Sequence, residues 1–103
     1  MDRIEKLKEF LVSTPHDSFV QHALALEFIK IGDDEGAKKL FLALLERDPT
    51  YIGSYYHLGK LLERQGEEGK AIDWYQRGME AAKAAGDNHA YGELRGAFEE
   101  LSF

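Results

Sequence analysis

The sequence predicts an all-α protein of about six helices arranged as antiparallel hairpins, and three observations point to this fold class. Apolar residues recur at spacings of three and four, which is the period of an amphipathic helix. β-branched residues are scarce and only two prolines occur. Residues also match one another at a constant separation of 34 positions, which is typical of stacked helical repeats.

The repeat appears as pairs of matching residues at this one separation. Eight identical or similar pairs keep it: Pro15 with Pro49, Leu24 with Leu58, Gly32 with Gly66, Ala37 with Ala71, Glu46 with Glu80, Phe28 with Leu62, Phe41 with Tyr75, and Leu45 with Met79. A unit of this length holds two helices and their turns, so the duplicated element is predicted to be a helical hairpin.

The helices are expected in order along the chain, each ended by a recognisable signal. We expect them near residues 2–13, 17–31, 34–47, 51–65, 68–85 and 88–101. Gly32 can end the second helix in a left-handed conformation, and Asp33 can cap the third. The same stop and start recur at Gly66–Glu67 and Gly86–Asp87, although Glu is a weaker cap than Asp.

Pro49 marks the end of the third helix. Proline lacks an amide donor and disfavours helix in the residue before it. Thr50, which follows directly, is expected to cap the fourth helix.

Composition and charge exclude several classes of function. Hydrophobic residues make up 44% of the 103 residues and charged residues 31%, which is globular composition. The net charge of -6 disfavours nucleic acid and anionic membranes as partners. There is no cysteine, and no apolar run suits a signal peptide or a membrane span. A cytoplasmic protein is therefore the expectation.

The duplicated positions resemble the tetratricopeptide repeat family, whose pattern is an aromatic residue, Leu-Gly, a second aromatic, Ala, an aromatic and a closing Pro. The residues that carry the resemblance are Gln21, Leu24, Ala25, Phe28, Ala37, Phe41 and Pro49 in the first copy, and Tyr55, Leu58, Gly59, Leu62, Ala71 and Tyr75 in the second. The resemblance implies a short right-handed α-solenoid and a non-catalytic module that binds other proteins.

The same pattern divides the chain, which we expect to form a single domain 1–103. The first helix looks like the second half of a preceding repeat, because Leu7, Phe10, Leu11 and Pro15 stand 34 positions before Phe41, Leu44, Leu45 and Pro49. The expected parts are an N-terminal half-repeat helix at 1–16, repeats at 18–49 and 52–83, and a C-terminal capping helix at 87–103.

Small residues have a steric role in this pattern, and the chain departs from the pattern at several positions. Ala25 or Gly59 would let paired helices approach closely, while Phe41 and Tyr75 would pack into the joint with the following repeat. The departures are that Gln21 replaces an aromatic residue, Leu44 and Gly78 stand where Ala is favoured, and Lys83 replaces a proline. The last change predicts that the fifth helix continues to Gly86.

In this family the first helix of each repeat lines a concave groove. The resemblance therefore implies a protein-binding or peptide-binding set of Phe19, His22, Leu26, Tyr56, His57, Lys60 and Arg64, flanked by Ala23, Ile29, Lys30, Gly53 and Glu63. The mixture of apolar, aromatic and cationic groups suits a peptide that presents a hydrophobic side chain and an acidic group.

Two alternatives stay open for this groove. Phe19, Leu26 and Ile29 can instead pack against the N-terminal helix. A clamp on a C-terminal carboxylate, the family's best-known peptide mode, is disfavoured because Ala23 and His57 occupy the places of its asparagines. If His22 and His57 face the groove, binding is expected to depend on pH near 6.5.

No catalytic, cofactor-binding or metal-binding residues are predicted. The four histidines, His16, His22, His57 and His89, do not have metal-ligand spacing. Adjacent carboxylates such as Glu99 and Glu100 point apart on a helix, and there is no phosphate-binding glycine loop. The expected partner is another protein, and the alternative is self-association, with a homodimer possible through the terminal helix or the groove.

Overall fold

The computed structural model describes residues 2–102, and this part of the chain forms six α-helices and no strand. The helices are α1 (Arg3–Ser13), α2 (Ser18–Lys30), α3 (Asp34–Arg47), α4 (Gly53–Arg64), α5 (Glu68–Ala85) and α6 (Asn88–Ser102). Each begins and ends within two residues of the position expected from sequence, and the all-α fold class is confirmed.

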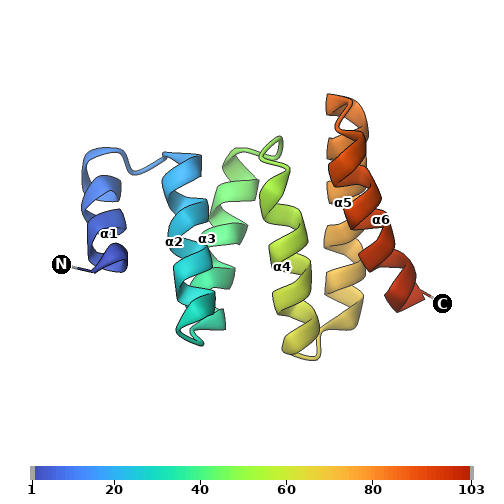
Figure 1. Cartoon of the computed structure of the whole chain (residues 1–103), viewed down its shortest axis with the longest axis horizontal. Coiled ribbons are helices and arrows are strands. Elements are labelled where there is room, and N and C mark those ends of the chain that lie inside the picture. Colours follow the sequence, from blue (N-terminus) through green and yellow to red (C-terminus); the bar gives the residue numbers. More distant parts are fainter. Residues whose placement is uncertain (1, 103) are drawn as a thin grey trace. The chain divides into compact units, whose positions relative to one another are not determined.

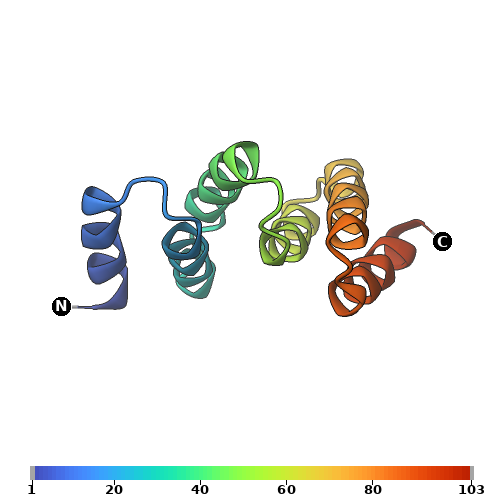
Figure 2. The ribbon, with the colours of Figure 1, turned by 90° about the horizontal axis from the view of Figure 1, so that it is seen from above.

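The helices group into two compact units, Met1–Asp48 and Pro49–Phe103, and the division falls at the proline that closes the first repeat copy. In the first unit α2 packs against both α1 and α3, and successive helices run antiparallel (Figure 1). In the second unit α5 packs against α4 and α6, and α6 also contacts α4. Seen from above, α6 folds back obliquely along α5 (Figure 2).

The core of the first unit joins all three of its helices. Leu7 of α1 is buried together with three residues of α2, and Leu40 of α3 packs against the same cluster. The α2 members are Val20, Ala23 and Leu24. This burial of apolar surface, worth about 25 cal/mol per Å², is what holds α1 against the hairpin.

Three interhelical turns use one chemistry. The glycines Gly32, Gly66 and Gly86 have φ of 82°, 77° and 71°, a conformation that residues with a side chain adopt only with strain. In each turn the next amide donates to a carbonyl five residues back: Asp33 to Phe28 at 2.8 Å, Glu67 to Leu62 at 2.9 Å, and Asp87 to Ala82 at 2.9 Å. The predicted helix stops are therefore confirmed, including the extension of α5 through Ala85.

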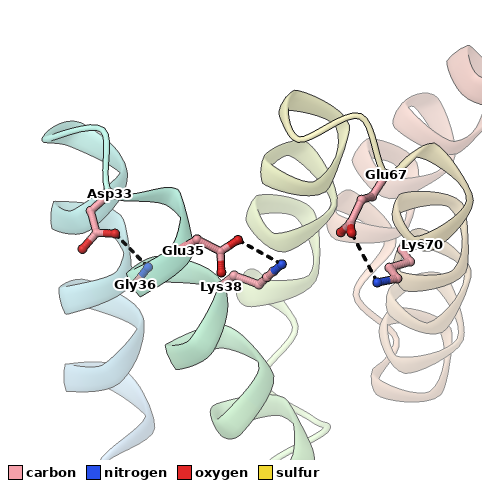
Figure 3. A network of polar contacts seen from close by, with 6 residues as sticks. All are labelled: Asp33, Glu35, Gly36, Lys38, Glu67 and Lys70. Carbon is pink, nitrogen blue, oxygen red and sulfur yellow. Dashed lines mark hydrogen bonds and ion pairs between the residues drawn. The ribbon is translucent and has the colours of Figure 1, made fainter.

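The residues that follow Gly32 and Gly66 cap their helices differently, as expected for Asp and Glu. The carboxylate of Asp33 accepts a hydrogen bond from the amide of Gly36 at 2.9 Å (Figure 3). Glu67, at the equivalent position before α5, makes no such cap and instead pairs with Lys70 at 3.3 Å. The extra methylene of Glu carries its carboxylate past the helix end.

The cap of α4 differs from the expectation, which placed it at Thr50. The capping position is Ile52, whose side chain makes no capping hydrogen bond. Two of the first amides are satisfied by a tighter turn of backbone, in which Ser54 donates to the Tyr51 carbonyl at 3.3 Å and Tyr55 to the Ile52 carbonyl at 3.2 Å. Helix α4 consequently starts two residues later than expected.

The replacement of an aromatic residue by Gln21 preserves a hydrogen bond. The Tyr55 hydroxyl donates to the Pro49 carbonyl at 2.6 Å. The side-chain amide of Gln21, 34 positions earlier, donates to the Pro15 carbonyl at 3.5 Å, and its oxygen accepts from Arg47 at 2.8 Å. Both repeat copies thus tie the start of their first helix to the preceding proline turn.

Glycine allows the helices of the second unit to touch. A Cβ on Gly59 would overlap the ring of Tyr75. The ring therefore packs against Gly59 of the same hairpin, in addition to any contact with a following repeat. A Cβ on Gly78 would lie 2.7 Å from Tyr55 and 3.0 Å from Leu94. These two glycines therefore set how closely α4 and α6 approach α5.

Replacing Gly59 by Ala is expected to destabilise the protein by about 1–3 kcal/mol, because the tyrosine ring has to move out of a packed site. Gly92 is the matched control, since a Cβ there meets nothing within 4 Å. Gly92→Ala is expected to stabilise by about 0.5–1 kcal/mol through helix propensity. Urea denaturation of both variants checks the pair. Equal stabilisation by the two substitutions would contradict the packing argument.

Exchanging the two cap residues is expected to have opposite effects. Glu67→Asp should raise the free energy of unfolding by about 0.5–1 kcal/mol, because the shorter carboxylate reaches the free amides of α5. Asp33→Glu should lower it by a similar amount by removing the cap on α3. Thermal denaturation of the two variants measures both effects, and a change of the same sign in both would rule the mechanism out.

Candidate functional site

The first unit places its candidate residues on α2 with different degrees of exposure. Phe19, in the first turn, is 66% exposed. His22 and Leu26 are half-buried, and the His22 ring meets the Phe41 ring edge-on with centroids 5.8 Å apart. Phe19 therefore remains available to a partner, whereas His22 is held against the hairpin.

The flanking residues of α2 divide between core and surface. Ala23 is buried beside Leu7 in the core of the first unit, so it is not a groove residue. Ile29 is half-buried, and Lys30 is exposed and pairs with Glu27 at 3.0 Å. The alternative that the N-terminal helix covers Phe19 does not fit its exposure.

The second unit brings its candidates together on α4. The rings of Tyr56 and His57 meet edge-on at 5.8 Å, and the Lys60 ammonium lies 5.6 Å from the Tyr56 ring centroid. The ring centroid of Tyr56 also lies 6.5 Å from that of Tyr75. Three of the four residues predicted here therefore form one aromatic and cationic cluster, while Arg64 is exposed one turn further along the helix.

A groove runs between α4 and α6, made of two adjoining pockets of about 230 and 190 Å³. Tyr56 and Glu93 line both pockets. The remaining lining residues are Ile52, Gly53, His57, Ala90 and Leu94 in the first pocket, and Lys60, Gly92, Gly96, Ala97 and Glu100 in the second. We define this surface of the second unit as the α4–α6 groove.

Sequence reasoning missed the contribution of α6 to this groove. The sequence analysis places the candidate residues on the first helix of each repeat alone, whereas Glu93 and Glu100 of α6 also line the groove. The available signal was Gly92 and Gly96, four residues apart in an otherwise regular helix. Glycine in a helix interior costs about 1 kcal/mol relative to alanine, so a pair on one face often marks a surface that must remain open.

The charges in the groove are linked to the core. The Nζ atom of Lys60 lies 3.6 Å from Oε2 of Glu63 and 3.9 Å from Oε2 of Glu100 in α6. The Tyr75 hydroxyl donates a short hydrogen bond to the same Glu63 carboxylate. Burial, reinforced by this hydrogen bond, raises the pKa of Tyr75 well above its usual value of 10.0. A buried tyrosine thus orients the carboxylate that holds Lys60.

His57 is neutral at pH 7. Burial lowers its pKa below the usual 6.5, and the nearby Arg64 lowers it further, while Glu93 opposes both effects. The groove therefore presents an uncharged imidazole, one ammonium and the carboxylates of α6 under neutral conditions.

Nothing in the described part of the chain assembles into a metal centre: within residues 2–102, no group of three histidine or carboxylate side chains could hold an ion. No helix in this same stretch has the length and apolar character needed to cross a membrane. The α4–α6 groove offers apolar and aromatic contact, hydrogen bonding and charge pairing, which are the interactions of a binding surface.

Comparison with known proteins identifies the repeat. Tetratricopeptide repeat models match residues 20–51 and 40–73. A tetratricopeptide repeat domain protein from Salinibacter ruber is 42% identical, with a TM-score of 0.81 over 84% of this chain and 96% of its own. A protein from Bordetella parapertussis is 25% identical, with a TM-score of 0.84 over 99% of this chain and 89% of its own.

A curated relative gives the same result at the level of sequence. A tetratricopeptide repeat-containing protein of Pseudomonas aeruginosa is 26% identical over 91 residues, which is 88% of this chain and 87% of that protein. Together with the matched repeats and the helix packing within each hairpin, these likenesses show that the chain belongs to the tetratricopeptide repeat family.

Proposed function

We propose that the chain is a non-catalytic interaction module, a scaffold or adaptor that binds a peptide or helix of a partner protein. Tetratricopeptide repeats generally mediate contacts between proteins. The observation that carries the proposal is the α4–α6 groove, which is open and has aromatic, cationic and carboxylate groups on its walls. In the second unit the proposed contacts are Tyr56, His57, Lys60 and Arg64 of α4. In the first unit they are Phe19, His22 and Leu26 of α2.

The groove favours a ligand with one apolar side chain and one carboxylate. The Tyr56 ring offers a face for the apolar group. The Lys60–Glu100 pair spans 3.9 Å and Glu100 is 74% exposed, and exposed pairs of this kind contribute only about 0–1 kcal/mol. A ligand carboxylate can therefore replace Glu100 at Lys60 at little cost, and Arg64 is one turn away to add a second contact.

Charge variants test this ligand chemistry in both directions. After affinity enrichment of a partner from the native cell, calorimetry with the purified partner is expected to show that Lys60→Glu weakens binding about tenfold or more, which corresponds to about 1.4 kcal/mol. Glu100→Gln should strengthen binding, since it removes one of the two carboxylates that pair with Lys60. Tyr56→Ala should also weaken binding.

Lys39→Glu is the matched control for these variants, because Lys39 is exposed on α3, outside the α4–α6 groove. It should leave affinity unchanged. Equal affinities for the Lys60→Glu, Tyr56→Ala and unmodified proteins would refute the groove as the binding surface.

The pH dependence of binding follows from the lowered pKa of His57. Because the pKa of His57 is lowered below 6.5, the part of any affinity change that comes from its protonation should have its midpoint below pH 6.5. His57→Gln should remove this part of the change. Titration calorimetry of both proteins over pH 5–8 is the measurement. A midpoint above 6.5 that the substitution abolishes would contradict the neutral imidazole.

Self-association is the second candidate, and exposed apolar side chains favour it. In the first unit Phe10 of α1 and Phe19 of α2 are 60% and 66% exposed. Aromatic rings are common anchors of contacts between chains. Light scattering over a concentration series separates the candidates, because peptide capture alone leaves the unmodified chain monomeric.

A further inference from the structure

The α4–α6 groove carries more negative than positive charge. The charged side chains that line its two pockets are Lys60, Glu93 and Glu100. The ammonium of Lys60 is shared between two carboxylates, since it pairs with Glu63 at 3.6 Å and with Glu100 at 3.9 Å. His57 adds no positive charge at neutral pH, because burial lowers its pKa below 6.5. The groove therefore has a negative charge that a ligand carboxylate cannot balance.

Glu93 is the carboxylate that supplies this unbalanced charge. It lines both pockets, and its charge acts on the groove wall, because it opposes the lowering of the pKa of His57. Within residues 2–102 Glu93 pairs with His89 at 3.4 Å and with no lysine or arginine. Both side chains of that pair are largely exposed, and exposed pairs contribute only about 0–1 kcal/mol. A cation from another molecule can therefore take the place of His89 at little cost.

The surroundings of Glu93 suit the side chain of an arginine. The adjoining pocket of about 230 Å³ has apolar walls that include Ile52 and Leu94, which can cover the methylene stem. The Tyr56 ring borders the same pocket and attracts cations, as the Lys60 ammonium 5.6 Å from its centroid shows. A guanidinium can also donate two parallel hydrogen bonds to one carboxylate, which favours arginine over lysine here.

The cationic and anionic contacts of the groove lie at a defined separation. Glu93 and Glu100 are seven residues apart on α6, which is two helical turns or about 10 Å. Because Lys60 pairs with Glu100, the contact for a ligand carboxylate lies near Glu100 and the contact for a ligand cation lies near Glu93. A partner segment that uses both needs opposite charges about seven residues apart in a helix, or about three residues apart in an extended strand.

We propose that the α4–α6 groove selects a partner segment of mixed charge, which carries an arginine for Glu93 in addition to the carboxylate for Lys60. This inference rests on the proposed function, because it specifies the ligand of the same groove. Glu93 is then a specificity-determining residue. It attracts a segment with a basic side chain at this spacing and rejects a purely acidic one, since like charges brought together at an interface are unfavourable.

A displayed library of random peptides tests the inference with no need of an identified partner. Peptides of about sixteen residues span about four helical turns, which is enough to hold both charges. They are selected on the unmodified protein, and an enriched peptide is kept when Lys60→Glu or Tyr56→Ala weakens its binding. The kept peptides are expected to be enriched in arginine at about seven or about three positions from an aspartate or glutamate.

A charge exchange between protein and peptide tests the contact directly. Glu93→Arg should weaken the binding of the kept peptides about tenfold or more in titration calorimetry. Replacing the arginine of a kept peptide by glutamate should weaken its binding to the unmodified protein and restore binding to the Glu93→Arg protein. This rescue requires the two side chains to meet, so a merely structural role of Glu93 would not produce it.

Glu99→Arg is the matched control, because it makes the same change of charge on α6 outside the lining of the groove. It should leave the affinity of the kept peptides unchanged. Circular dichroism and the melting temperature check the folding of both variants. Glu93 is 56% exposed, so its replacement should be tolerated. Glu93→Gln takes the place of Glu93→Arg if the latter melts early, and it should weaken binding in the same direction.

The outcomes separate this inference from the proposed function. Kept peptides with no enrichment of arginine, or with equal affinities for the Glu93→Arg and unmodified proteins, would overturn the role of Glu93 and leave the groove as the binding surface. A selection in which no enriched peptide depends on Lys60 or Tyr56 would instead refute the groove as the binding surface, and the role of Glu93 with it.

Discussion

The second unit depends on one close contact, in which the ring of Tyr75 lies directly over Gly59. Only glycine leaves room for an aromatic ring against the backbone of α4, so this contact fixes the separation of the paired helices. It also has a polar consequence, because the hydroxyl of the same ring donates to Glu63. Glu63 in turn holds Lys60 beside the Tyr56 face. The packing of the hairpin and the arrangement of the α4–α6 groove therefore share one cause.

The two repeat copies keep equivalent interactions even where their residues differ. Gln21 and Tyr55 reach the carbonyl of the preceding proline with an amide in one case and a hydroxyl in the other. The turns at Gly32 and Gly66 have the same sign of φ and the same hydrogen bond across the helix end. The feature that recurs every 34 residues is thus a set of hydrogen bonds to backbone groups. Different side chains can make the same hydrogen bond.

Sequence reasoning succeeded where the determining interaction is local. Helix periodicity, the glycine stops and the Asp33 cap depend on residues within one turn of each other, so all three were predictable. The start of α4 was not, because its capping position is Ile52 and backbone carbonyls accept from the amides of Ser54 and Tyr55. The pairing of Lys60 with Glu100 spans forty positions and arises only once α6 packs against α4. No pattern in a single sequence specifies which exposed charges from separate helices meet.

The path from Tyr75 through Glu63 to Lys60 connects the interior to the α4–α6 groove through two consecutive polar contacts. In the proposed binding mode, a ligand carboxylate that draws Lys60 away leaves the Tyr75 hydroxyl as a partner of Glu63. The strength of that hydrogen bond alters the near-ultraviolet absorption of a tyrosine. Occupancy of the groove consequently acquires an intrinsic optical reporter, with no added label.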